Sequence, residues 1–315
     1  MESRLIILLL LAGCTATPRG DGLTDASVGA TPSETGDSNG NTTGGVGDDG
    51  GTVGDTGSPT GTAGDDADGG TGLLLDVGAE PTGGQGEIAE VFGHSDDTLY
   101  RVDPTTKAVE EVGTFDGCDT IIDIALDANS QMYGTSYESL YAIDRTTGAC
   151  TFIADGEYPT SLSFVPAGTV DPDNEAMVGF VEEQYIRIDV ATGAVTPLGT
   201  LTDGLVSSGD LVSVNGGGSW LTVEGPGCAN SDCIIEIDPS TGAVLKNYGT
   251  MPFDQVFGLA FWAGRAYGFS RSGVLFEIEF GEDAVMTTPI QIPGAPFDLE
   301  FFGAGSTTSA PPAEG

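Results

Sequence analysis

The stretch LYAIDRTTG at residues 140–148 decides the fold, because four further versions of it occur in the chain. The first five residues of each version alternate in side-chain character with a period of two, as expected of a β-strand, and the fifth residue is acidic. These acidic residues recur at intervals of 41–49 residues and are Asp103, Asp144, Asp189, Asp238 and Glu279. A regular period of this length predicts a repeat protein in which each copy is one small structural unit.

A tight turn follows the strand in four of the five copies. The acidic side chain can accept backbone N–H groups within the turn, and a glycine such as Gly148 or Gly242 supplies a positive φ. Lys107 replaces that glycine in the first copy, and the last copy reads FGED at residues 280–283. We therefore expect the first and last turns to differ from the other three.

Two more strands precede each of these hairpins, so one period contains four strands, as in the blade of a β-propeller. The expected inner strands lie at residues 123–127, 161–166, 209–215, 258–264 and 298–303. The first blade has no inner strand before it, and the last inner strand has no partners after it. We therefore predict an all-β, five-bladed propeller over residues 88–305, closed by pairing of residues 298–302 with residues 91–95. Residues 306–315 are predicted to be a disordered tail, whose removal should have little effect.

The repeated phrase at residues 140–144, followed by Thr147 and Gly148, resembles the bacterial repeat propellers of the NHL and YVTN kind. This resemblance covers nearly all of the predicted propeller, and it implies a blade but no particular ligand. The Thr-Gly turn is also similar to that of quinoprotein propellers. Their repeating tryptophan is missing here, since the chain has only Trp220 and Trp262, so no quinone cofactor is inferred.

The first fourteen residues predict an export signal. Arg4 precedes an apolar run at residues 5–11, and small residues then lead to Cys14, which resembles a bacterial lipobox. The resemblance implies cleavage before Cys14 and its lipidation, which would anchor the protein to a membrane. Thr15 in the next position favours the outer membrane in lipoprotein families, so we expect a cell-envelope lipoprotein. An ordinary secretory signal is the alternative.

Residues 15–87 are predicted to be a disordered, acidic tether, because glycine, threonine and aspartate dominate at least residues 15–72 and large apolar residues are rare there. The whole chain has nine Lys and Arg residues against 48 Asp and Glu, a net charge of −39. Nucleic-acid binding is excluded as a function class, because it needs clustered basic residues. We expect a monomer that contacts the membrane through its lipid anchor.

Four cysteines remain once Cys14 is lipidated, and an oxidising compartment favours disulfides. Cys228 and Cys233 flank a short loop, and we predict a bridge between them in preference to half of a zinc site. Elimination leaves Cys118 and Cys150, which either pair with each other or remain as two buried thiols.

Three aspartates are candidate metal ligands. Asp123, Asp210 and Asp298 stand at or just before predicted inner strands, where they would converge at the mouth of the central tunnel. Carboxylates suit Ca²⁺, and small propeller lactonases place a metal similarly. The alternative is that each aspartate caps a backbone turn. His94, the only histidine, has no accompanying nucleophile motif and is expected to be structural.

Two functions from different classes follow. The leading hypothesis is a membrane-anchored binding module whose loop face engages a protein, a peptide or a glycan. The rival is a metal-dependent hydrolase or lyase that uses Asp123, Asp210 and Asp298 as ligands.

Overall fold

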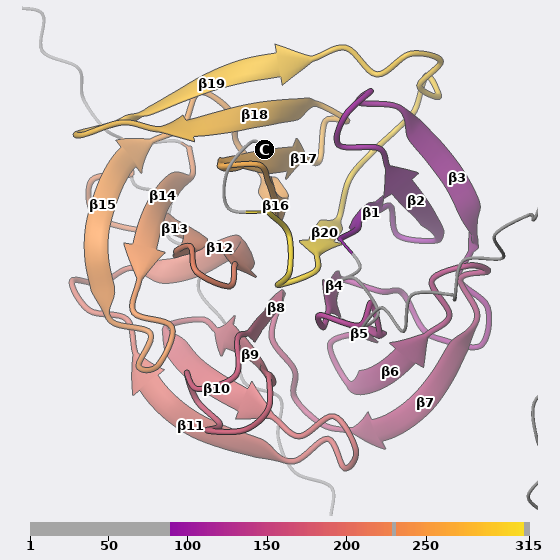
Figure 1. Cartoon of the computed structure of the whole chain (residues 1–315), viewed down its shortest axis with the longest axis horizontal. Coiled ribbons are helices and arrows are strands. Elements are labelled where there is room, and N and C mark those ends of the chain that lie inside the picture. Colours follow the sequence, from indigo (N-terminus) through magenta and orange to yellow (C-terminus); the bar gives the residue numbers. More distant parts are fainter. Residues whose placement is uncertain (1–88, 229–230, 312–315) are drawn as a thin grey trace, which may run out of the picture. The chain divides into compact units, whose positions relative to one another are not determined.

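The computed structural model describes residues 89–228 and 231–311, which form a ring of five four-stranded antiparallel sheets (Figure 1). The all-β, five-bladed propeller predicted from the repeats is therefore confirmed. The predicted signal, lipobox and tether, residues 1–87, lie outside the described residues. Within the described part, no helix is long and apolar enough to cross a membrane.

Each blade contains one repeat, and its strands are numbered from the ring axis outward except in the first blade, where the C-terminal strand is innermost. The first blade comprises β20 (Gly303–Ser306), β1 (Val91–His94), β2 (Thr98–Val102) and β3 (Val109–Thr114). The second comprises β4 (Asp123–Leu126), β5 (Met132–Thr135), β6 (Ser139–Ile143) and β7 (Cys150–Asp155). The third comprises β8 (Ser161–Val165), β9 (Ala176–Val181), β10 (Gln184–Ile188) and β11 (Val195–Thr200). The fourth comprises β12 (Val206–Ser213), β13 (Ser219–Glu224), β14 (Cys233–Ile237) and β15 (Val244–Thr250), and the fifth β16 (Val256–Trp262), β17 (Arg265–Ser270), β18 (Leu275–Phe280) and β19 (Val285–Ile290).

The ring is closed by the C-terminal strand, as predicted, but at a different place in the sequence. β20 pairs antiparallel with β1, with Gly303 opposite His94 and Ser306 opposite Val91. Residues 298–302, the predicted closing strand, form a turn and an irregular segment instead. Phe301 still packs in the core, which explains why the segment has the apolar pattern of a strand without being one.

Crowding near the ring axis explains why glycine-rich residues form this innermost strand. A Cβ added to Gly303 would lie 2.3 Å from His94 Nε2 and 2.6 Å from Asp123 Oδ1, which is too close for either atom to stay in place. A Cβ on Gly258 of the neighbouring β16 would lie 2.7 Å from the Cβ of Ala304. The closing strand therefore consists of small residues, which a search for bulky alternating residues overlooks.

The C-terminal segment after β20 belongs to the propeller, so the predicted disordered tail begins too early. Thr307 and Thr308 are buried, and the segment contacts every blade as it crosses the ring axis. Thr307 N donates to Glu90 O before β1, and the residue forms a bridge with Leu126 of the second blade. The remaining contacts are Thr308 Oγ1 with Glu175 Oε1 in the third blade, Asn215 N with Thr308 O in the fourth, and Ala263 N with Pro311 O in the fifth.

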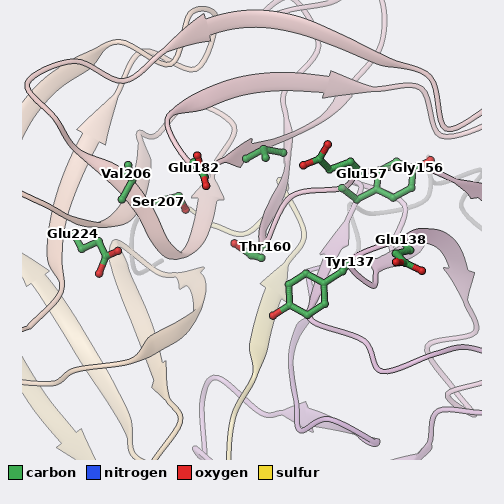
Figure 2. A pocket seen from close by; sticks show the side chains of 11 residues that line it. Tyr137, Glu138, Gly156, Glu157, Thr160, Glu182, Val206, Ser207 and Glu224 are labelled. Atoms are coloured by element: carbon green, nitrogen blue, oxygen red, sulfur yellow. The ribbon is translucent and has the colours of Figure 1, made fainter. Parts of the chain in front are cut away.

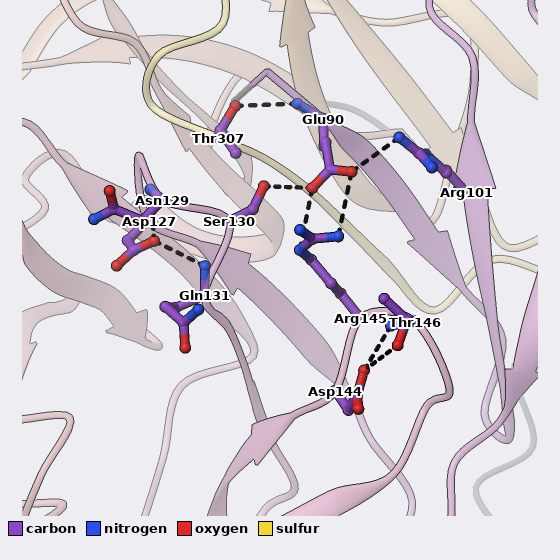
Figure 3. A network of polar contacts seen from close by, with 10 residues as sticks. All are labelled: Glu90, Arg101, Asp127, Asn129, Ser130, Gln131, Asp144, Arg145, Thr146 and Thr307. Atoms are coloured by element: carbon purple, nitrogen blue, oxygen red, sulfur yellow. Dashed lines mark hydrogen bonds and ion pairs between the residues drawn. The ribbon is translucent and has the colours of Figure 1, made fainter. Parts of the chain in front are cut away.

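A buried carboxylate joins the first two blades where this segment begins (Figure 3). Glu90 accepts a hydrogen bond from Arg101 at 2.9 Å and another from Ser130 Oγ at 2.5 Å, and it pairs with Arg145 at 3.3 Å. Its backbone N–H donates to Thr307 Oγ1 at 3.2 Å. The Glu90 side chain is only 6% exposed, so this ion pair is screened by solvent less than a surface pair.

The turns of the first four repeats have the predicted acidic acceptor and the positive φ. The first of these turns was expected to differ. Hydroxyl and backbone N–H donors lower the pKa values of Asp144, Asp189 and Asp238, and the associated glycines have φ values of 72–80°. Lys107 adopts the same conformation at φ 62°, so the first turn does not differ. Its Nζ contacts Glu277 and Tyr267 of the fifth blade, which offsets the strain of a non-glycine residue. The last turn does differ, since Gly281 donates to Ala284 O.

We predict that deleting residues 307–315 destabilises the propeller. Three backbone hydrogen bonds to the blades, the bond from Glu90 N to Thr307 Oγ1 and the Thr308–Glu175 contact would be lost, each with a net contribution of about 1 kcal/mol. A loss of this size should lower the Tm by about 10 °C. Deleting only residues 312–315 removes none of these contacts and is the control. Thermal unfolding of both truncated chains tests the prediction, and equal melting of the longer deletion and the intact chain would contradict it.

Candidate functional site

The two faces of the ring differ in how they are closed. On one face, here called the tail face, the segment 307–311 crosses the axis. The opposite face, here called the mouth face, lies at the ends where the inner strands begin, marked by Asp123 and Gly303. There a hollow of about 260 Å³ opens above the axis. Its lining includes Ile122, Thr160, Gly209, Phe257 and Phe302, each of which comes directly before a buried inner-strand residue in the sequence. Access to the ring interior is therefore from the mouth face.

Five equivalent positions surround the axis just below this hollow. Asp123, Ser161, Gly258 and Gly303 lie opposite Thr135, Phe180, Phe269 and His94 in their blades, and Asp210 N donates to Thr222 Oγ1 at 2.8 Å. The sequence placed Asp298 in the fifth position, where the structure has Gly303. Asp298 lies in an exposed turn, so the predicted convergence of three aspartates does not occur. The cause is the shifted closing strand.

Asp123 and Asp210 each join two neighbouring blades. Both side chains are fully buried, and each accepts one N–H from its own inner strand and one from the inner strand of the next blade. Asp123 binds Ile124 N at 2.9 Å and Leu162 N at 2.6 Å. Asp210 binds Leu211 N and Leu259 N, both at 2.6 Å. The hydrogen bonds thus match the alternative in which each aspartate caps backbone N–H groups. One of the two capped groups in each case belongs to the next blade.

The two carboxyl groups also contact each other in the tunnel. Burial raises the pKa of Asp123 well above its usual value, and the charge of Asp210 and a hydrogen bond to it act in the same direction. Burial likewise raises the pKa of Asp210, although its hydrogen bonds oppose this rise. Two buried carboxylates in contact cannot both ionise without a large cost, so we infer that they share a proton.

His94 lies beside this pair as a neutral imidazole. Burial lowers its pKa to about 4, although the hydrogen bond to the Ser95 carbonyl acts in the opposite direction. Because a carbonyl oxygen can only accept, Nδ1 carries the proton and donates to Ser95 O at 2.6 Å. Nε2 is buried without a hydrogen-bond partner among the described residues. The residue is fully buried, with no part of it exposed on either face of the ring.

No three His, Cys, Asp or Glu side chains in residues 89–228 and 231–311 are arranged to hold a metal ion. The predicted Cys228–Cys233 disulfide is present, and Cys118 and Cys150, for which the sequence left a bridge or two thiols open, are also bridged. The first closes the loop before β14, and the second ties the segment after β3 to β7. Cys14, the predicted lipidation site, lies outside the described residues.

A second hollow lies beside the tunnel mouth and was not predicted from the sequence. It has a volume of about 870 Å³ and lies between loops of the second, third and fourth blades (Figure 2). Tyr137, which is 68% exposed, and Thr160 line both this pocket and the tunnel-mouth hollow. Four glutamates, Glu138, Glu157, Glu182 and Glu224, line it as well. No single motif contains these residues, because they come from separate loops whose ends meet only in the ring.

Comparisons with known proteins assign no family to the chain. No family model and no curated protein matches the chain. A chain of the nidogen–laminin complex is 11% identical, with a TM-score of 0.42 over 71% of this chain and 100% of that one. Hydrazine synthase from Kuenenia stuttgartiensis is 12% identical, with a TM-score of 0.37 over 62% of this chain and 60% of that one. BamB from Moraxella catarrhalis is 14% identical, with a TM-score of 0.32 over 62% and 71% respectively.

We predict that Asp123→Asn reduces the dependence of stability on pH. Because the folded pKa of Asp123 is raised above 3.8, the folded state keeps a proton that the unfolded state releases, so stability falls as pH rises through this interval. Asparagine keeps one of the two backbone acceptors and a donor for Asp210 without ionising, and the loss of the second acceptor lowers stability equally at every pH. The difference in unfolding free energy between variant and wild type should become more favourable to the variant by at least about 1 kcal/mol from pH 5 to pH 8.

Urea unfolding at both pH values measures this difference. Asp283→Asn, in an exposed turn, is the matched control and should show no such trend. A constant difference for Asp123→Asn across the pH range would show that the pair holds no extra proton.

Proposed function

We propose that this protein is a lipid-anchored binding protein of the cell envelope, in which the mouth face of the propeller engages a protein, a peptide or a glycan. The observation that carries the proposal is the pocket of about 870 Å³ on the mouth face, with the exposed Tyr137 on its rim. Exposed aromatic side chains in a concave surface are common in recognition sites. The tail face is covered at its centre by the chain's own C-terminal segment, which favours the mouth face as the binding surface.

A binding role is supported over a metal-dependent hydrolase or lyase. Asp298 lies apart from Asp123 and Asp210, and each of these two carboxyl groups already accepts two backbone N–H groups. His94 is enclosed in the core. Calcium binding near the tunnel stays a prediction from the sequence, for which the structure offers two of the three expected ligands.

The anchor rests on residues 1–14 and has its own test. The full chain expressed in a bacterium should incorporate labelled palmitate and fractionate with membranes, because an acylated cysteine inserts its chains into the bilayer. Cys14→Ser should lose the label and become soluble, whereas Thr15→Ala should keep it. Membrane association of Cys14→Ser at the wild-type level would contradict the proposed anchor.

The binding face is tested by site-specific crosslinking on the full chain in intact cells. A photoreactive phenylalanine at position 137 should give discrete adducts with a partner, and excess soluble protein should suppress them. The control position is Leu245, which is 61% exposed on the outermost strand β15 of the fourth blade. Adducts of equal yield from both positions, or none from position 137, would contradict a specific mouth-face partner.

A further inference from the structure

The pocket beside the tunnel mouth is lined by carboxylates that have no cationic partner. Glu138, Glu157, Glu182 and Glu224 are all exposed, and no Lys, Arg or His is among the eleven residues lining the pocket. Figure 2 shows these side chains distributed around the hollow and not at one edge. Four like charges around a concave surface produce a focused negative potential, which attracts and orients a cation.

Several carboxylates elsewhere in the described residues are neutralised by the protein itself. The five ion pairs among the described residues use Glu90, Asp171 and Glu277, none of which lines the pocket. Aspartates of the repeated turns accept several N–H and O–H donors each. The glutamates of the pocket have neither kind of partner, so their charge remains available to a ligand.

Two further features of the pocket suit a guanidinium or ammonium group. The Tyr137 ring is 68% exposed on the rim, and an aromatic face stabilises a cation above it. The same protein uses this contact elsewhere, with Lys246 Nζ 4.2 Å from the ring centre of Tyr248 and Arg271 5.2 Å from that of Phe302. The Oγ of Ser207, in the pocket wall, is buried and has no hydrogen-bond partner among the described residues. It is a free acceptor for one more N–H.

We propose that this pocket binds an arginine- or lysine-rich peptide segment of a partner protein. The inference rests on the proposed binding function and specifies the chemistry of the ligand. A volume of about 870 Å³ lies in the range of sites that hold extended ligands larger than one side chain. The glutamates come from three blades, so several cationic side chains on one segment can each meet a carboxylate.

The test measures binding of fluorescein-labelled tetra-arginine to the full chain carrying Cys14→Ser, by fluorescence anisotropy at 0.15 M salt. The triple variant Glu157→Gln, Glu182→Gln, Glu224→Gln should weaken binding at least about tenfold, because each lost charge removes a direct partner. The matched control is Glu110→Gln, Glu111→Gln, Glu279→Gln, which changes the net charge equally at exposed strand positions outside the pocket. It should change the affinity by no more than about twofold.

Tyr137→Ala separates the pocket from the general field of the protein, because it leaves the charge unchanged. It should weaken binding about fivefold through the lost cation–π contact. Equal effects of the two triple variants, no effect of Tyr137→Ala, or no measurable binding of tetra-arginine would overturn the proposal. Spermine binding as tightly as tetra-arginine would overturn the assignment to a peptide. If crosslinks from position 137 persist while tetra-arginine fails to bind, the binding function stands and only the cationic ligand is wrong.

Discussion

The narrow axis of the ring is the constraint on which the structure depends. Five inner strands meet there, and the space between them accommodates only glycine, small side chains or groups that bond directly to a neighbouring backbone. This explains a closing strand of sequence GAGS at residues 303–306, and it explains why Asp123 and Asp210 reach the N–H of the next blade. The same crowding encloses His94, whose side chain is fully buried. Any recognition of a partner is therefore left to the loops.

The two faces then take different roles because the chain ends on one of them. After β20 the segment 307–311 contacts all five blades across the axis, and Glu90 binds the first blade to the second beside it. The first and last strands of the propeller, β1 and β20, pair with each other and close the ring. Without this pairing, the ring would have two unpaired strand edges at which it could open. Within residues 89–228 and 231–311, no segment crosses the mouth face in this way, and this face has the hollows at the tunnel and beside it.

Local regularity made the fold predictable from the sequence, and long-range packing limited the prediction of details. Alternation repeats in all five copies and the turn in four of them, so the blade number, the strand order and the C-terminal closure followed from counting. The exact position of the closing strand could not be predicted in this way. Residues 298–302 have a strand-like pattern, but the strand forms at residues 303–306, where only a residue without a side chain fits beside His94 and Asp123. The prediction that Asp298 lies at the tunnel mouth was wrong for the same reason. Lys107 shows a third case, in which contacts with another blade stabilise a turn that its own sequence disfavours.

The protein holds its many carboxylates in three different ways, and this difference indicates where binding energy is available. In the turns, hydroxyl and backbone donors satisfy the charge and lower the pKa, as at Asp144. At the axis, burial and mutual contact raise the pKa values, so the pair of Asp123 and Asp210 reduces its charge by retaining a proton. In the pocket of the mouth face, no group within the described residues does either for the four glutamates. A ligand that supplies positive charge there gains an interaction that folding left unused, whereas the same ligand at a turn would compete with donors already in place.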